Sequence, residues 1–314
     1  MPTPSIITVS LNPAVDRVLE VERFTVGAHQ VGREVLRIAG GKAINVSRVL
    51  AALEVRSVAT GFLGEENRGS FESVLRNPLI VNEFFPLPGR TRENVTIADR
   101  ASGQETHIRD VGLQVAPRFL ERLEKKLRLL ETAGSIVIFS GSLPPGITAA
   151  EFARLVESCT AADARVAVDT SGDALRAVAG RDLWLVKPNA AELSLLVGQD
   201  LPSRDEQLQA ARSLTSTVEN VLFTRGAEGA WCFTRELALH GRAAISPEQV
   251  RNTVGCGDAL LGAFVAGVSR ETPLRETFRD AVACATASAM TLAPAEFDPA
   301  VFDELRGKVE LTEL

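Results

Sequence analysis

The most informative stretch of the chain is Asn252-Thr253-Val254-Gly255-Cys256-Gly257-Asp258, which an apolar helical run over 259–265 follows directly. Two glycines around a small residue leave backbone N–H groups accessible at the start of a helix, where the dipole favours an anion. Asp258 would stand beside that anion hole as a general base, an arrangement that suits phosphoryl transfer. An ordinary helix N-terminus, with Asp258 as its cap, explains the heptapeptide equally well.

Composition favours a globular protein with a small-molecule partner. The 314 residues, 45% of them hydrophobic, can form one large α/β domain or two small ones. A net charge of −6 and the absence of basic runs argue against nucleic acid as a partner. The chain has no apolar run of about 18 residues and no signal-like N-terminus, so neither membrane insertion nor secretion is expected.

The four cysteines are scattered at 159, 232, 256 and 284, without a C-x-x-C pair or histidines at ligand spacing. Neither a zinc site nor a disulfide framework is indicated. Reduced thiols of this kind are typical of a cytoplasmic protein, which is the location we expect.

Two features near the N-terminus resemble parts of a ligand site. The first strand, 5–11, ends at Asn12-Pro13-Ala14-Val15-Asp16, which places a carboxylate at the sheet edge where α/β proteins bind ligands. Gly40-Gly41-Lys42 then opens a second helix over 43–53, whose first turn presents the Asn45 amide. Simple turns would explain both segments as well.

From residue 117 onward, short apolar strands alternate with helices, which predicts a parallel sheet with helices on both faces. We expect strands over 55–62, 135–140, 165–169, 183–186 and 220–224, and helices over 66–75, 117–131, 148–160, 173–178, 205–214, 258–269 and 274–291. No repeat or linker divides the chain. Residues 1–314 therefore form a single predicted domain.

Two excursions, 17–38 and 90–110, have the alternating pattern of exposed strands, and the second is a hairpin around Ala101-Ser102-Gly103. Together they predict a small sheet that covers the main domain as a lid and excludes water. Arg92, at the start of the hairpin, would point its charge toward an anionic substrate group, although a solvated surface arginine is the commoner case.

Five loops in a fixed order resemble those of the ribokinase-like, or PfkB, family of carbohydrate kinases, over roughly residues 8–292. They are Asn12-Pro13-Ala14-Val15-Asp16, Gly40-Gly41-Lys42-Ala43-Ile44-Asn45, Gly141-Ser142-Leu143-Pro144-Pro145-Gly146, Lys187-Pro188-Asn189-Ala190-Ala191-Glu192 and Gly255-Cys256-Gly257-Asp258. Together with Thr91-Arg92-Glu93-Asn94, they look like the phosphosugar kinases of the family. The fold implied is ribokinase-like, a Rossmann-like sheet with a β-sheet lid.

The resemblance implies a role for each matching residue. Asp258 would be the general base, and Gly255, Cys256 and Gly257 would form the anion hole. The sugar phosphate would be held by Asp16, Gly41, Lys42, Asn45 and Arg92. ATP would contact Lys187, Asn189, Thr224, Gly226 and Gly229, and Glu192 would bind Mg²⁺ through water.

Some positions depart from the family pattern. The branch commonly carries an Asn-Arg pair in the first lid strand, where this chain has Gln30-Val31. Arg33 would lie on the same strand face and could substitute in holding the phosphate. Cys256 replaces the usual alanine and would be a reactive thiol if the helix N-terminus lowers its pKa. Arg225 stands where the branch often has an apolar residue and is a candidate for nucleotide or substrate contact.

The implied reaction is ATP- and Mg²⁺-dependent phosphorylation of a ketohexose phosphate, foremost fructose 1-phosphate, with tagatose 6-phosphate and fructose 6-phosphate as alternatives. A non-catalytic sugar-phosphate-binding regulator is a remote alternative, disfavoured because Asp258, Asn189 and Glu192 are all present. A dehydrogenase fails because no Gly-x-Gly-x-x-Gly follows the first strand. An apolar face on the lid predicts a homodimer that pairs two lids.

Overall fold

Ten strands form one mostly parallel sheet in the computed structural model, which describes residues 5–314. Their order is β14-β13-β12-β11-β10-β9-β8-β1-β4-β5. Neighbours from β5 to β11 run parallel, whereas β12, β13 and β14 are antiparallel. The strands are β1 (Ile6–Ser10), β4 (Ser57–Gly64), β5 (Ile80–Leu87), β8 (Ile136–Ser140), β9 (Arg165–Asp169), β10 (Leu183–Val186), β11 (Val218–Thr224), β12 (Ala230–Phe233), β13 (Ala238–Arg242) and β14 (Glu310–Glu313).

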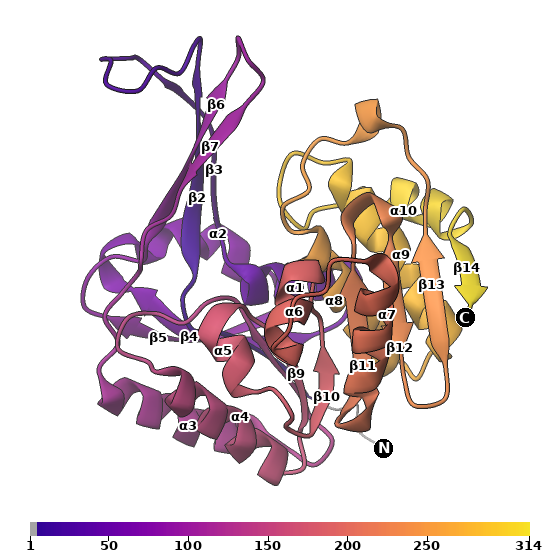
Figure 1. The fold of residues 1–314 in the computed structure, drawn as a ribbon. Coiled ribbons are helices and arrows are strands. Elements are labelled where there is room, and N and C mark those ends of the chain that lie inside the picture. The colour runs from indigo at the N-terminus through magenta and orange to yellow at the C-terminus, as the bar shows by residue number, and fades with distance from the viewer. Residues whose placement is uncertain (1–4) are drawn as a thin grey trace.

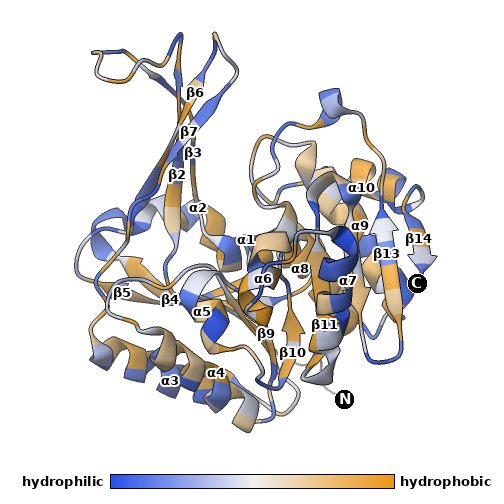
Figure 2. Cartoon of the chain, viewed as in Figure 1, coloured by the Kyte–Doolittle hydropathy of each residue, from blue (hydrophilic) through white to orange (hydrophobic). Residues whose placement is uncertain are grey.

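Helices cover both faces of the sheet, as predicted (Figure 1). Along β8, Val137 and Phe139 face one core while Ile136 and Ile138 face the other, because successive side chains of a strand point to opposite sides. The first core contains α3 (Pro117–Leu130), α4 (Ala149–Ala161), α5 (Gly172–Ala177), α6 (Ala190–Val197) and α7 (Arg204–Ser213), and the second contains α1 (Lys42–Ala52), α8 (Cys256–Ser269), α9 (Leu274–Ala289) and α10 (Pro299–Arg306). Burial on both faces explains why the inner strands are continuous apolar runs, which Figure 2 shows in orange.

The predicted lid is a separate four-stranded sheet that projects from the body (Figure 1). Its order is β3-β2-β6-β7, and the strands are β2 (Ala14–Val21), β3 (Arg33–Gly40), β6 (Glu93–Asp99) and β7 (Glu105–Ile108). The hairpin around residues 101–103 is confirmed, since β6 pairs with β7 in antiparallel register. No residue of β6 is fully buried and every residue of β7 is exposed, which is consistent with a sheet standing free of the core.

Three segments differ from the sequence expectations. Residues 66–75 form the 3₁₀ helix η1 (Glu65–Phe71) and only one α-helical turn, α2 (Glu72–Leu75). The unpredicted strand β5 lies at the sheet edge, where the missing N–H of Pro86 is tolerated. The C-terminal α10 and β14 were also unpredicted; β14 adds to β13 after the two expected apolar helices.

Short 3₁₀ turns complete the chain at η2 (Leu214–Ser216), η3 (Gly226–Glu228) and η4 (Pro247–Gln249). Within residues 5–314, every helix is too short or too polar to cross a bilayer.

Candidate active site

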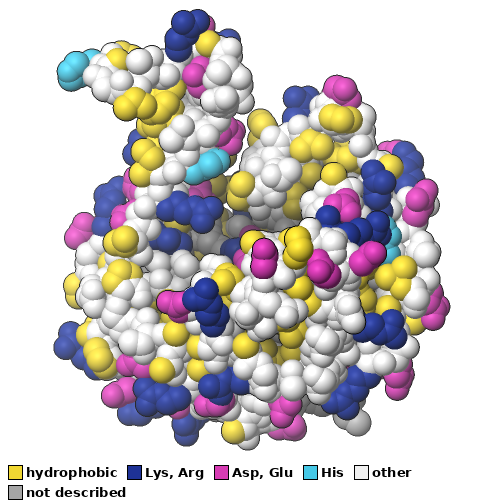
Figure 3. All heavy atoms as spheres, viewed as in Figure 1, with side chains coloured by type: hydrophobic (Ala, Val, Ile, Leu, Met, Phe, Trp, Pro, Cys, Tyr) yellow, Lys and Arg dark blue, Asp and Glu magenta, His cyan; other side chains and the backbone are white. Residues whose placement is uncertain are grey.

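The carboxyl ends of β1, β8, β9, β10 and β11 lie at one edge of the sheet, since these strands are adjacent and parallel. The lid rises from the same edge, because β2 begins only a few residues after β1 ends. Figure 3 shows a hollow between the lid and the C-terminal half of the molecule, with basic side chains along its lid side. The loops singled out in the sequence therefore converge here.

The predicted anion hole lies at the N-terminus of α8. Gly255 is the N-cap with φ 86°, and a Cβ at this position would lie 2.5 Å from the backbone N of Ala295, so that only glycine fits. Within residues 5–314, the N–H groups of Gly255, Gly257 and Asp258 have no acceptor, and that of Cys256 reaches the Thr253 carbonyl only at 3.5 Å. The turn thus offers free N–H donors, which suits the predicted binding of an anion.

Asp258 lies in the first turn of α8 and is 4% exposed. Its Oδ2 accepts a 2.8 Å hydrogen bond from Nδ2 of Asn45, which belongs to α1. Burial, together with the nearby charge of Asp169, raises the pKa of Asp258 to about 6, while Lys42 and Lys187 oppose the rise. A carboxylate with this pKa is ionised at neutral pH yet basic enough to take a proton from a hydroxyl group.

The burial of Cys256 argues against a reactive thiol at this position. Burial raises the pKa of Cys256 to about 11, and the Asp258 charge adds to the increase. Hydrogen bonding with Ser288 opposes the increase without cancelling it. The thiol is therefore protonated at neutral pH, and Cys256 fills the position of a small residue in the anion hole.

The second glycine-opened helix, α1, faces the first. Gly41 is its N-cap with φ 121°, and a Cβ there would lie 3.0 Å from the Cα of Pro13. Close packing of these two loops brings Lys42 and Asn45 to the same hollow as Asp258. The two glycine-opened helices therefore lie at one hollow.

Asp169, at the end of β9, is a functional candidate that the sequence reasoning missed. It is 1% exposed, and its Oδ1 lies 3.0 Å from Nζ of Lys42 and 3.2 Å from Nζ of Lys187. Its Oδ2 accepts a hydrogen bond from Ser140. Burial alone would raise the pKa of Asp169, but the two lysines hold it below its usual value. An ionised carboxylate at the end of a buried strand is the same signal that singled out Asp16.

The charge of Lys42 is likewise held by this carboxylate. Burial opposes the charged form of Lys42, but Asp169, Asp258 and Glu192 together raise its pKa. Lys187 is 5% exposed and lies over Gly257, where an added Cβ would meet its Nζ at 2.9 Å. Both ammonium groups therefore stand beside the anion hole, in position to neutralise phosphate charge.

The residues predicted for the nucleotide lie in adjacent loops. Asn189 forms an isolated parallel bridge with Thr224, and the Thr224 N–H donates to the Pro188 carbonyl. Asn189 and Glu192 make a capping box at the start of α6, in which Glu192 Oε2 accepts from the Asn189 N–H. The capping box occupies one oxygen of each side chain. Oε1 of Glu192 and the Asn189 amide nitrogen have no partner within residues 5–314.

On the sugar side, Arg92 has an unusual set of partners. Its guanidinium donates to the carbonyls of Asn12, Pro13 and Asp110 and to the Ser142 hydroxyl, at 2.9 to 3.3 Å. Within residues 5–314 no carboxylate lies within ion-pair distance, and burial lowers the pKa of Arg92. A partly buried cation without a counter-charge at the base of the lid suits an anionic substrate group.

The fold places Asp16 and Arg33 in different parts of the lid. Asp16 Oδ1 accepts a 2.8 Å hydrogen bond from Asn94, which is two residues beyond Arg92, so Asp16 lies at the same end of the lid as Arg92. Arg33 does not join them. Its guanidinium pairs with Glu20 at 3.1 Å, and 76% of its side chain is exposed, because the lid strands carry it away from the body. The expectation that Arg33 shares a phosphate with Arg92 is not met within this chain.

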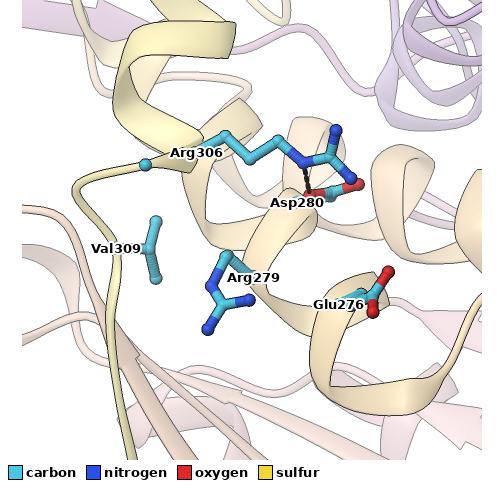
Figure 4. Close-up of a pocket in the computed structure, with 6 residues that line it drawn as sticks. Glu276, Arg279, Asp280, Arg306 and Val309 are labelled. Atoms are coloured by element: carbon cyan, nitrogen blue, oxygen red, sulfur yellow. Dashed lines mark hydrogen bonds and ion pairs between the residues drawn. The ribbon is translucent and has the colours of Figure 1, made fainter.

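A separate pocket of about 460 Å³ lies between α9 and α10 (Figure 4). Arg306 donates to Asp280 at 2.5 Å there, so the charges of the pocket are partly neutralised from within. None of the residues predicted for the site line it. No group of three or more acidic, histidine or cysteine side chains within residues 5–314 is arranged to hold a metal ion alone.

The family model of the pfkB family carbohydrate kinases matches residues 8–298. This chain belongs to the pfkB family. It is therefore a sugar kinase, a phosphotransferase with an alcohol acceptor, and the site described above is where the family resemblance places its chemistry.

Among the relatives of this pfkB kinase are two proteins named 1-phosphofructokinase. The one from Bacillus subtilis is 33% identical over 287 residues, which cover 91% of this chain and 93% of the relative. The one from Haemophilus influenzae is 30% identical over 309 residues, 98% of each chain. Phosphofructokinase-2 from Escherichia coli, solved in complex with potassium, superposes with a TM-score of 0.89 at 25% identity and covers 97% of this chain and 98% of its own.

A ribokinase from Arabidopsis thaliana has the same fold, with a TM-score of 0.73 at 20% identity over 97% of this chain and 99% of its own. The ribokinase-like fold expected from the five loops is therefore confirmed for this pfkB kinase.

Proposed function

We propose that this kinase is a 1-phosphofructokinase, which transfers the γ-phosphoryl group of MgATP to fructose 1-phosphate and releases fructose 1,6-bisphosphate. The observation that carries the proposal is the juxtaposition of Asp258, with its pKa of about 6, and the free N–H groups of α8. The carboxylate accepts the proton of the attacking hydroxyl while the N–H groups stabilise charge on the transferring phosphoryl group. The names of the relatives support the choice of substrate.

Each remaining group has a role in this reaction. Asn45 orients Asp258. Asp16 and Gly41 bind sugar hydroxyls, and Arg92 binds the phosphate already on the sugar. Lys42 and Lys187, fixed by Asp169, neutralise the phosphates of ATP. Thr224, Gly226 and Gly229 line the nucleotide. The unused Oε1 of Glu192 would suit a water-mediated contact to Mg²⁺ bound with ATP, where the ion would supply charge neutralisation.

The test is an ADP-release assay with fructose 1-phosphate, fructose 6-phosphate, tagatose 6-phosphate and free fructose. The highest kcat/KM should be found with fructose 1-phosphate, and free fructose should be far poorer because Arg92 would have no phosphate to bind. Equal kcat/KM for free fructose and the phosphate esters would contradict a phosphosugar kinase. A preference for tagatose 6-phosphate would keep the reaction and replace the substrate.

We also propose a cytoplasmic homodimer that pairs two lids. Apolar side chains stand exposed on the lid: Val26 is 89% exposed, Val31 96% and Ile108 55%. Pairing of lids would cover them. Phosphofructokinase-2 from Escherichia coli has an inhibited tetrameric form, so assembly occurs among structural neighbours. Sedimentation velocity at micromolar concentration should give a dimer, and Val31→Asp should give a monomer. A monomeric wild type would refute the assembly.

A further inference from the structure

The turn between β11 and β12, residues 224–229, carries three of the groups assigned above to ATP. It also carries Arg225, which the sequence made a candidate for direct contact with nucleotide or substrate. The inference that follows rests on the proposed function, since it concerns how this turn holds ATP.

Arg225 folds back onto its own turn. Its Nε and Nη2 donate to Oε1 of Glu228 at 3.0 and 2.7 Å, and its Nη1 donates to Oε1 of Gln207 on α7. Gln207, 9% exposed, is held in turn by the Leu201 carbonyl. Only 20% of the Arg225 side chain is exposed. In the structure, the polar contacts of this guanidinium are thus all with Glu228 and Gln207 of the protein itself.

The backbone of the turn is constrained at both ends. Thr224 is fixed to Pro188, and Gly229, with φ 97°, packs so closely on β13 that a Cβ would lie 2.3 Å from the Gly241 carbonyl oxygen. The Glu228 carbonyl contacts His240 Nε2 at 2.8 Å. Between these anchors, Gly226 adopts φ 53° and Ala227 is exposed. The Arg225–Glu228 pair spans this exposed middle part.

We propose that Arg225 is a positioning residue for ATP: by pairing with Glu228 and Gln207 it fixes the 224–229 turn in the conformation that binds the nucleotide phosphates. The apolar residue common at this position in the branch could not make these bonds. In this chain the ion pair and the contact with α7 make the turn rigid. A rigid turn reduces the entropic cost of ordering that ATP binding requires.

The two possible roles of Arg225 predict opposite behaviour of Glu228. If Arg225 acts through Glu228, then Glu228→Gln should weaken MgATP binding as Arg225→Met does. If Arg225 binds a phosphate directly, Glu228→Gln would release the guanidinium and leave MgATP binding unchanged or tighter. Glu228 is exposed, so its variant should fold even where Arg225→Met does not.

The experiment is titration calorimetry with MgATP, alongside kinetics with fructose 1-phosphate. Both single variants should raise the Kd and KM for MgATP about fivefold, the size expected for a partly exposed ion pair. The double variant should be no worse than either single one, because both changes remove one pair. Arg225→Lys, which keeps the charge, should lie between. The kcat and the KM for the sugar should stay within about twofold, since neither Arg225 nor Glu228 is among the groups that perturb Asp258.

Arg176→Met is the matched control, because Arg176 makes a similar i,i+3 pair with Asp173 on α5, and it should leave MgATP affinity unchanged. Unchanged Kd in both variants, or a lowered melting temperature alone, would overturn the proposal. So would weak binding in Arg225→Met with normal binding in Glu228→Gln. Calorimetry with MgATP needs no turnover, so a wild type that binds MgATP without phosphorylating any sugar phosphate would refute the proposed function and still test this inference.

Discussion

The cleft floor consists of Lys42, Asn45, Asp169, Lys187 and Asp258. Its charges are mostly buried, whereas the charges of the lid above it are partly exposed to solvent. In the floor, the two carboxylates and Lys187 are each at most 5% exposed. In the lid, the ion pairs among Arg17, Glu34, Arg37 and Glu93 are partly solvated, with side chains 16 to 40% exposed.

This difference determines what a substitution can do. Buried charges interact strongly because little water screens them, so removing one floor charge changes the protonation of the others. Partly exposed ion pairs contribute little to stability and are screened by salt. Substitutions in the floor should therefore alter kcat and its pH dependence, whereas substitutions in the lid should alter substrate binding and assembly.

The strongest test of the floor is Asp258→Asn. Loss of the general base should lower kcat by at least ~10², while the Kd for MgATP stays near the wild-type value. The variant should also be more stable than the wild type at neutral pH. The folded pKa of about 6 lies above the ordinary aspartate value of 3.8, so the ionised carboxylate destabilises the fold, and stability is lost as pH rises through this window. Stopped-flow kinetics and thermal melts measure both effects. A variant that keeps more than a tenth of the wild-type kcat would contradict the assignment of Asp258 as the general base.

The floor was more predictable from sequence than the lid. Glycines before a helix, as at Gly41 and Gly255, mark a local backbone requirement that a sequence shows directly. Asp169 was missed because its partners, Lys42 and Lys187, come from separate loops. Only the strand order of the sheet brings them together.

The lid strands were recognised from their alternation, but the alternation does not show which exposed residues reach the site. Arg33 was placed on the expected strand, and yet its pairing with Glu20 at the exposed part of the lid separates it from Arg92. Likewise, the helix dipole suggested a reactive Cys256, whereas burial dominates its pKa. In both cases the deciding quantity was tertiary, a strand register or a degree of burial.

The next test concerns the base of the lid. Arg92→Ala should lower kcat/KM for the phosphosugar by ~10- to 150-fold, because a charge-assisted contact contributes about 1.5–3 kcal/mol. The KM for ATP should change little. Since the structure separates Arg33 from Arg92, the losses in the double variant Arg92→Ala/Arg33→Ala should multiply. A double variant that loses less than the product would show that both arginines act on one phosphate.

The pH dependence tests the coupling within the floor. With the pKa of Asp258 at about 6, kcat/KM should fall about tenfold per pH unit below pH 6, as the base becomes protonated. Asp169→Asn removes the charge that raises this pKa, so the acid limb should move to lower pH. Glu34→Gln in the lid is the control and should leave the limb in place. An unmoved limb in Asp169→Asn would contradict the coupling.

The smallest effect is expected from substitution of Arg48. Its side chain links α1 to the N-terminus of α8 through residues 294–296. Arg48 lies one turn beyond Asn45 on α1, and its side chain is 14% exposed. It donates to the Pro294 carbonyl at 3.0 Å and pairs with Glu296. Pro294 and Ala295 in turn pack against Gly255, which holds the anion hole open. The arginine thus fixes the anion hole relative to the helix that orients Asp258.

Arg48→Met keeps the length of the side chain and removes its hydrogen bonds. We expect kcat to fall about fivefold, corresponding to ~1 kcal/mol of transition-state stabilisation, with the KM values for both substrates nearly unchanged. Glu296→Gln is the matched control: because the bond to Pro294 remains, its kcat should fall less. Arg48→Lys should recover part of the loss. A role limited to stability would instead lower the melting temperature of Arg48→Met and leave kcat per folded molecule unchanged. That outcome would show that the bonds of Arg48 do not link the position of the anion hole to α1 during catalysis. The coupling within the floor would then be limited to the electrostatic interactions of its buried charges.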